Sequence, residues 1–99
     1  MQQVKFKRYD AAEYLDTEDK IIAYLDAAIE DGDPAVIARA IGNIARAKNM
    51  SRLARETGVS REGLYVALSG DGNPSFATIY KVISALGLKL TVGPAKTAS

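Results

Sequence analysis

The sequence predicts an all-α domain of five helices that ends in one short strand. Apolar residues recur at helical spacing in five successive segments. Each segment begins next to a residue that is favoured as a helix N-cap, and each ends at a glycine or an asparagine. Because 99 residues suffice for one core and not for two, we expect a single domain.

The first long helix is predicted to begin after Asp16 or Thr17, either of which suits an N-cap. Glu18 and Asp19 follow in its first turn, where the helix dipole favours negative charge. Gly32 suits its C-terminal end. Upstream, Asp10 is expected to cap a short turn that extends to residue 15, and residues 1–9 show no periodicity and are predicted to form an arm.

The second long helix is predicted from Asp33-Pro34, an N-cap followed by proline at the first helical position, to Lys48-Asn49. The last helix is predicted to start at Ser75 and to end at Gly87. The following LKLTV, residues 88–92, alternates and predicts a short strand. The organisation is thus an arm, a domain over 10–92 and a flexible tail over 93–99.

A pair of short helices is predicted at 52–57 and 61–69, with Ser51 and Ser60 as N-caps. Gly58 lies where a tight turn requires a residue that tolerates positive φ, and Ala54 is small enough for two helices to cross closely. The apolar residues expected to anchor the pair are Leu53, Val59, Leu64 and Leu68. The region 51–69 is therefore predicted to form a helix-turn-helix. The same pattern also suits a helical hairpin in a bundle that binds no DNA.

The composition argues against catalysis and cofactors. The chain has no cysteine, histidine or tryptophan, which removes disulfides, most transition-metal sites and the usual nucleophile–base pairs. We therefore expect no enzymatic activity, no metal and no cofactor. The first residues lack a secretory pattern and no apolar run is long enough for a membrane span, so a cytoplasmic protein is expected.

The charges of the chain are unevenly distributed. Residues 1–33 hold four basic and nine acidic residues, a net charge of −5, whereas residues 34–99 hold nine basic and three acidic residues, a net charge of +6. Separated signs predict two surfaces with different partners, a polyanion for the basic part and a basic protein for the acidic part. A merely solvated acidic face is the alternative.

The basic part carries a set of predicted DNA contacts. Arginine neutralises phosphates, helix N-termini bind them, and Arg61 and Glu62 at the start of the second short helix can read guanine and cytosine edges. The full set is Arg46, Ser51, Arg52, Arg55, Ser60, Arg61, Glu62, Tyr65, Asn73 and Ser75. Tyr65 equally suits a half-buried packing role, and the loop with Asn73 equally suits a plain connecting turn.

Residues 50–92 resemble the Cro/CI-type (XRE-like) helix-turn-helix, and residues 10–90 resemble the addiction-module antidote proteins, the HigA-like antitoxin family. The segments that carry the likeness are 10–16, 33–34, 45–47, 60–62, 64–65 and 68–76. The resemblance implies an antitoxin that neutralises a small basic toxin of the RelE/ParE superfamily (HigB-like), encoded by the adjacent gene. It also implies a dimer that represses its own operon, with 60–69 as the DNA-reading helix.

Two further surfaces are predicted. The toxin-binding surface is predicted on the acidic N-terminal part, with tyrosines as rigid anchors. These tyrosines could equally pack on their own domain. The residues of this toxin-binding surface are Tyr9, Asp10, Glu13, Tyr14, Asp16, Glu18 and Asp19. The dimer contact is placed on the last helix and the strand, at Phe76, Leu86, Leu88 and Leu90. A stand-alone prophage-type regulator without a toxin, and an interaction module that has lost DNA binding, are the competing hypotheses.

Overall fold

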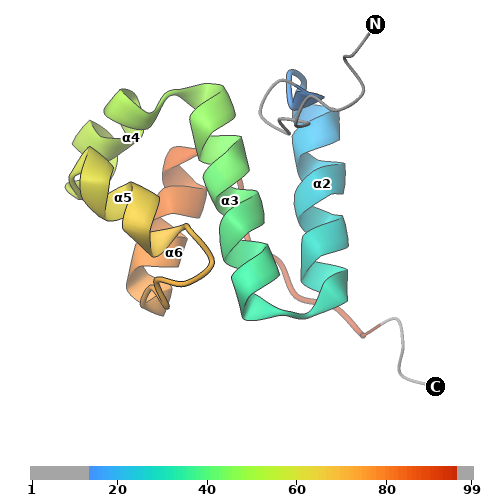
Figure 1. Ribbon diagram of the computed structural model, residues 1–99. Coiled ribbons are helices and arrows are strands. Elements are labelled where there is room, and N and C mark those ends of the chain that lie inside the picture. Colours follow the sequence, from blue (N-terminus) through green and yellow to red (C-terminus); the bar gives the residue numbers. More distant parts are fainter. Residues whose placement is uncertain (1–13, 96–99) are drawn as a thin grey trace, which may run out of the picture.

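The computed structural model describes residues 14–95, and within this range it contains five α-helices and no strand. The helices are α2 (Glu18–Asp31), α3 (Pro34–Lys48), α4 (Met50–Thr57), α5 (Arg61–Ala67) and α6 (Phe76–Ala85). In Figure 1, α3 stands in the middle, with α2 on one side and α4, α5 and α6 on the other. The all-helical part of the predicted fold is confirmed.

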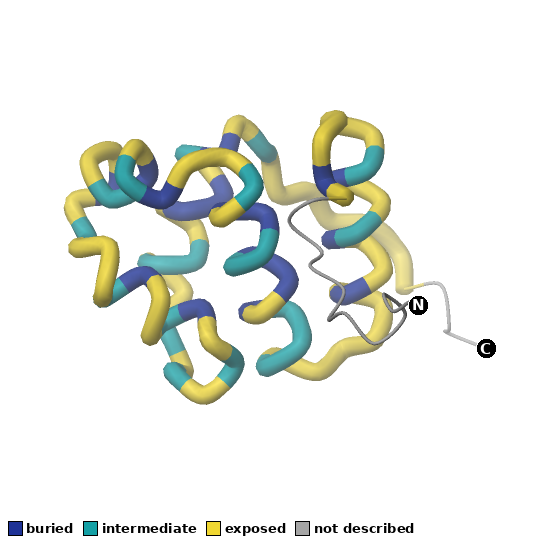
Figure 2. Tube along the Cα trace, turned by 45° about the horizontal axis from the view of Figure 1, so that its top comes forward, coloured by how far each residue is buried: buried dark blue, intermediate teal, exposed yellow. Residues whose placement is uncertain are grey.

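The core lies around α3. Ile41 and Ile44 of α3, Leu64 of α5 and Val82 of α6 are completely buried, with exposed fractions of 0%. Figure 2 shows the buried positions on the sides of the helices that face one another. The apolar stripes of separate helices therefore meet in one core, as their helical spacing predicted.

Most of the predicted caps are confirmed. The side chains of Thr17, Asp33, Ser60 and Ser75 each accept a hydrogen bond from a backbone N–H in the first turn of the helix that follows. Gly32 ends α2 in the left-handed conformation, with φ 83°. These short-range interactions satisfy N–H groups that would otherwise lack a partner at the helix ends.

The predicted start of the first short helix is wrong. Asn49 is the N-cap of α4, its side-chain oxygen accepting from the Arg52 N–H at 3.0 Å, and Ser51 lies inside the helix. The earlier start turns Met50 into the core, where it is 7% exposed. The second short helix also ends earlier than predicted, at Ala67, because Leu68 leaves helical geometry with its N–H still bonded to the Leu64 carbonyl.

The predicted strand at 88–92 is not formed. Its backbone has no ladder partner in the described part of the chain, and the Leu88 N–H instead bonds to the Ile83 carbonyl of α6 at 3.1 Å. The apolar alternation has a different cause, since Leu88 packs partly against the core while Leu90 is 39% exposed. Within residues 14–95, no helix is both long and apolar enough to cross a membrane.

Candidate nucleic-acid interface

The helices α4 and α5 are joined by a turn fixed by local hydrogen bonds. Gly58 has φ 77°, as the spacing predicted, and its N–H donates to the Ala54 carbonyl at 3.0 Å. The Thr57 hydroxyl donates to the Leu53 carbonyl at 2.7 Å and accepts from the Val59 N–H at 3.3 Å. A left-handed residue at this point lets the chain reverse within three residues. The pair is thus held at a defined angle.

The buried side of α5 positions its exposed side. Leu64 is completely buried and Leu68 is 4% exposed, while Arg61, Glu62 and Tyr65 face solvent. The hydroxyl of Ser60 accepts from the Gly63 N–H at 2.9 Å, which assigns that oxygen to the helix cap. Three side chains that can contact bases or phosphates therefore project from a helix whose opposite side is anchored in the core.

The predicted basic residues around the pair have different surroundings. Arg55 is exposed near the end of α4. Arg52 forms a salt bridge with Glu56, one turn further along α4, with 2.9 Å between Nε and the carboxylate. Arg46, at the end of α3, donates to the side chain of Asn43. Ser51 is half-buried inside α4, so it does not present a helix N-terminus to a phosphate.

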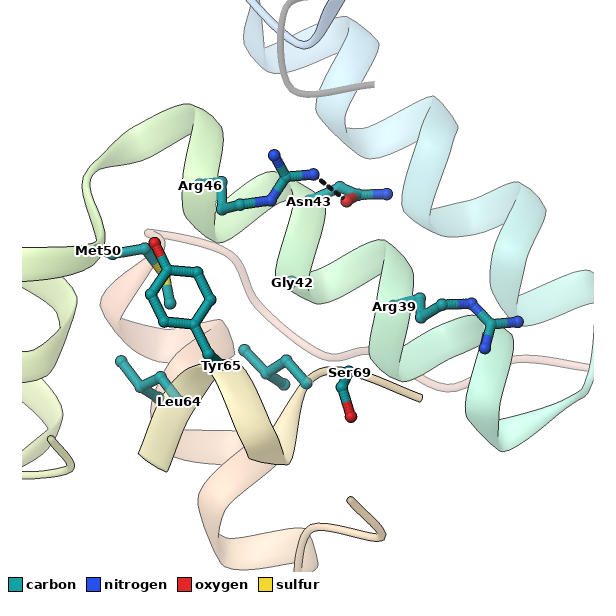
Figure 3. A pocket seen from close by; sticks show the side chains of 9 residues that line it. Arg39, Gly42, Asn43, Arg46, Met50, Leu64, Tyr65 and Ser69 are labelled. Carbon is teal, nitrogen blue, oxygen red and sulfur yellow. Dashed lines mark hydrogen bonds between the residues drawn. The ribbon is translucent and has the colours of Figure 1, made fainter. Parts of the chain in front are cut away.

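A groove of about 290 Å³ lies between α3 and α5. Arg39, Asn43 and Arg46 line it from α3, with Tyr65 on the opposite side, and Met50, Leu64 and Leu68 among its apolar lining residues (Figure 3). Leu68, the residue that follows α5, lies close to α3 at Gly42, where a Cβ would be 2.8 Å from the Leu68 carbonyl oxygen. A basic rim over an apolar floor suits a phosphate backbone or an anionic side chain.

The groove is connected to α2 by side-chain hydrogen bonds. The Asn43 amide donates to the Tyr24 hydroxyl of α2 at 2.8 Å, while its oxygen accepts from Arg46. One amide therefore spans from the helix on one side of α3 to the arginine on the rim of the groove.

Sequence reasoning missed Arg39, Asn43 and Ser69 as lining residues. A signal for the first two existed, because Arg39, Asn43 and Arg46 are spaced by four and three residues and so share one helix face. No pattern in the sequence indicates that the end of α5 lies against α3 at Gly42, and this contact is what turns the face into a groove.

The loop before α6 is closed by its own hydrogen bonds. The Ser69 hydroxyl donates to the Val66 carbonyl at 2.9 Å and accepts from the Asp71 N–H at 3.2 Å. Asn73 is exposed with φ 50°, and Ser75 caps α6. This geometry is that of a well-formed connecting turn, and a phosphate contact by Asn73 or Ser75 stays a prediction.

Of the predicted toxin contacts, Tyr9, Asp10 and Glu13 lie outside the described residues. Tyr14 and Asp16 both meet Lys20, whose Nζ lies 3.1 Å from the Asp16 carboxylate and 5.0 Å from the centre of the Tyr14 ring. The hydrogen bond and charge of Lys20 lower the pKa of Asp16 below its ordinary value of 3.8. Glu18 and Asp19 are exposed in the first turn of α2.

The predicted dimer residues divide between surface and core. Phe76 is 71% exposed and stacks on Tyr80, with 6.1 Å between ring centroids. Leu90 is exposed and Leu88 is half-buried. Leu86 is 6% exposed and belongs to the core, because it follows α6 directly and its N–H still bonds to α6 carbonyls. It offers almost no surface to a second copy.

The described residues thus define a small helical protein that presents an exposed helix and a basic groove. Residues 5–94 match a family described as "probable addiction module antidote protein". The chain is also 48% identical over 94 residues to an uncharacterized protein of Haemophilus influenzae, a match that covers 95% of this chain and 97% of the relative. No solved structure matches.

The chain therefore belongs to the family of probable addiction module antidote proteins. Membership supports an antitoxin role and implies a toxin as partner.

Proposed function

We propose that this antidote is a HigA-like antitoxin with two activities. It binds a small basic toxin of the RelE/ParE superfamily directly, and it represses its own operon as a dimer that binds operator DNA. In the second activity, α4 and α5 act as a Cro/CI-type helix-turn-helix. The protein acts by binding and not by turnover. The observation that carries the DNA-binding proposal is the exposure of Arg61, Glu62 and Tyr65 on a helix anchored by buried Leu64.

The charges around α5 support this assignment. Arg39 and Arg46 line the groove beside α5 and Arg55 is exposed on α4, so all three can neutralise phosphates. Phosphate contacts supply much of the affinity and orient the protein, whereas contacts to base edges supply the sequence preference. A helix of seven residues reads few base pairs, so two copies about one DNA turn apart are needed for a tight operator complex.

The test compares variants on an operator fragment and on unrelated DNA over a range of salt concentrations. Arg61→Ala is expected to cost about 1–3 kcal/mol on the operator and to relax the preference at one base pair. Arg39→Ala and Arg55→Ala are expected to weaken binding to all sequences and to reduce the salt slope by about 1. Exposed Lys81 lies on α6, away from the groove residues, so Lys81→Ala is the matched control.

Two outcomes would contradict the DNA-binding proposal. If Arg61→Ala weakens binding equally on operator and unrelated DNA, the side chain contacts phosphate and does not read a base. If all three arginine variants bind as tightly as the Lys81→Ala control, the interface lies elsewhere.

The antitoxin activity is tested by co-expression with the basic product of the adjacent gene. A stable complex and restored growth are expected. A chain that binds operator DNA but neither captures nor neutralises that product would be a stand-alone regulator.

A further inference from the structure

A second groove, of about 240 Å³, lies between α2 and the segment 88–91 that follows α6. Ile22, Leu25 and Ile29 line it from α2, and Leu88 and Leu90 line it from the other side. A strand was predicted for this segment, and the structure has an irregular segment there. We call this groove the α2 groove.

Three large apolar side chains around the α2 groove are partly exposed. Ile22 is 50% exposed, Ile29 46% and Leu90 39%, and Leu25 lies beneath them at 8%. Ile22 and Ile29 are seven residues apart, which places them on one face of α2, two turns from each other. Scattered single apolar residues are normal on a surface, but several that gather around one groove mark a binding site.

An acidic row borders this apolar stripe. Asp19 and Asp26 each stand three residues before one of the two isoleucines, so each acid is a neighbour of an isoleucine on the helix surface. Asp26 itself lines the groove. Lys89 is the one basic residue among those that line it. The chemistry that fits is a row of apolar side chains flanked by lysine or arginine.

A second copy of this chain fits this surface poorly. A twofold contact through α2 would set the acidic row of one copy against that of the other, and like charges across an interface are unfavourable. A basic partner meets only one like charge among the lining residues, that of Lys89. We propose that the toxin docks an amphipathic basic segment into the α2 groove. This proposal rests on the toxin partner of the proposed function.

The α2 groove and the nucleic-acid interface lie on different sides of the molecule. In Figure 1, α2 and α5 are separated by α3. A segment docked in the α2 groove therefore does not itself cover α5.

The test uses the full chain and the basic product of the adjacent toxin gene, and it measures the Kd of their complex. The double variant Ile22→Ser/Ile29→Ser removes the apolar stripe, and Asp26→Lys reverses the charge beside it. Asp31→Lys is the matched control. It makes the same change on the same helix, but five residues further along, which places it on another face of α2. Operator binding and circular dichroism are measured on every variant.

The double variant is expected to bind the toxin at least about tenfold more weakly, as loss of central apolar contacts usually does. Asp26→Lys is expected to weaken binding by a factor that shrinks as salt is raised. Asp31→Lys should bind like the unmodified chain, and all four proteins should bind operator equally. Because Asp26 is exposed, its variant keeps the test valid even if the double variant does not fold.

Unchanged toxin affinity in both groove variants would overturn the docking proposal. Loss of self-association in those variants would then assign the groove to a second copy. If the unmodified chain itself does not bind the toxin product, the proposed function fails, and the docking proposal fails with it.

Discussion

Replacing Gly42 by alanine tests how closely α3 and α5 approach. A Cβ at this position would lie 2.8 Å from the Leu68 carbonyl oxygen and 3.1 Å from the Leu68 Cβ. Real Cβ atoms essentially never come closer than 3.0 Å to another atom, and ordinary contacts begin at 3.4 Å, so Gly42 and Leu68 must move apart. The obstacle is backbone, which cannot rotate away, and overpacking of this kind costs about 1–3 kcal/mol.

A matched variant isolates that cost. Alanine in place of glycine inside a helix also gains about 1 kcal/mol of helix propensity, which hides part of the effect. Gly63 lies in α5, and its replacement by alanine gains the same helix propensity. A Cβ at Gly63 would meet only the ends of two side chains, Ser60 and Val59, at 3.1 Å. The difference between Gly42→Ala and Gly63→Ala therefore reports the overpacking at Leu68.

Urea unfolding and thermal melting provide the assay. Gly42→Ala is expected to be about 1–3 kcal/mol less stable than Gly63→Ala, with about 4–8 °C of Tm for each kcal/mol in a domain of this size. Operator affinity should fall as well, because the displaced α5 carries Arg61 and Tyr65. Equal stability of the two variants would refute the close approach of α3 and α5 on which the groove depends.

Two further predictions concern local interactions. Asn49→Ala should lower the free energy of unfolding by about 1 kcal/mol through loss of the α4 cap, whereas Ser51→Ala should change it by less than about 0.5 kcal/mol; urea titration that ranks the two in the reverse order would contradict the observed cap. The carboxyl signal of Asp16 in an NMR titration should show a pKa below 3.8, and Lys20→Met should raise it towards that value. Since the folded-state pKa is lowered, the stabilisation from this pair is present above pH 3.8 and is lost as the pH falls through the lowered pKa. An unchanged pKa in Lys20→Met would show that the pair does not form in solution.

The sequence predicted those features that depend on neighbours along the chain. The caps at Thr17, Asp33 and Ser60 and the left-handed turn at Gly58 each involve residues two to four positions apart. Such interactions can be recognised from residue type and spacing alone.

The errors arose where distant contacts decide between local alternatives. Asn49 and Ser51 are both good N-caps, and the burial of Met50 in the core decides between them. The alternation in 88–92 suits a strand, but it suits equally an extended segment that has one half-covered side, and a strand also needs a partner. Arg39 became a site residue only because the end of α5 crosses α3 beside it.

Two adjacent residues in the middle of α3 hold the helices on either side of it. Gly42 allows the end of α5 to make backbone contact on one side, and Asn43 donates to Tyr24 of α2 on the other. Successive side chains of a helix point about 100° apart, so neighbouring positions can serve two different partners. A single turn of α3 therefore contacts both α2 and the residue that follows α5.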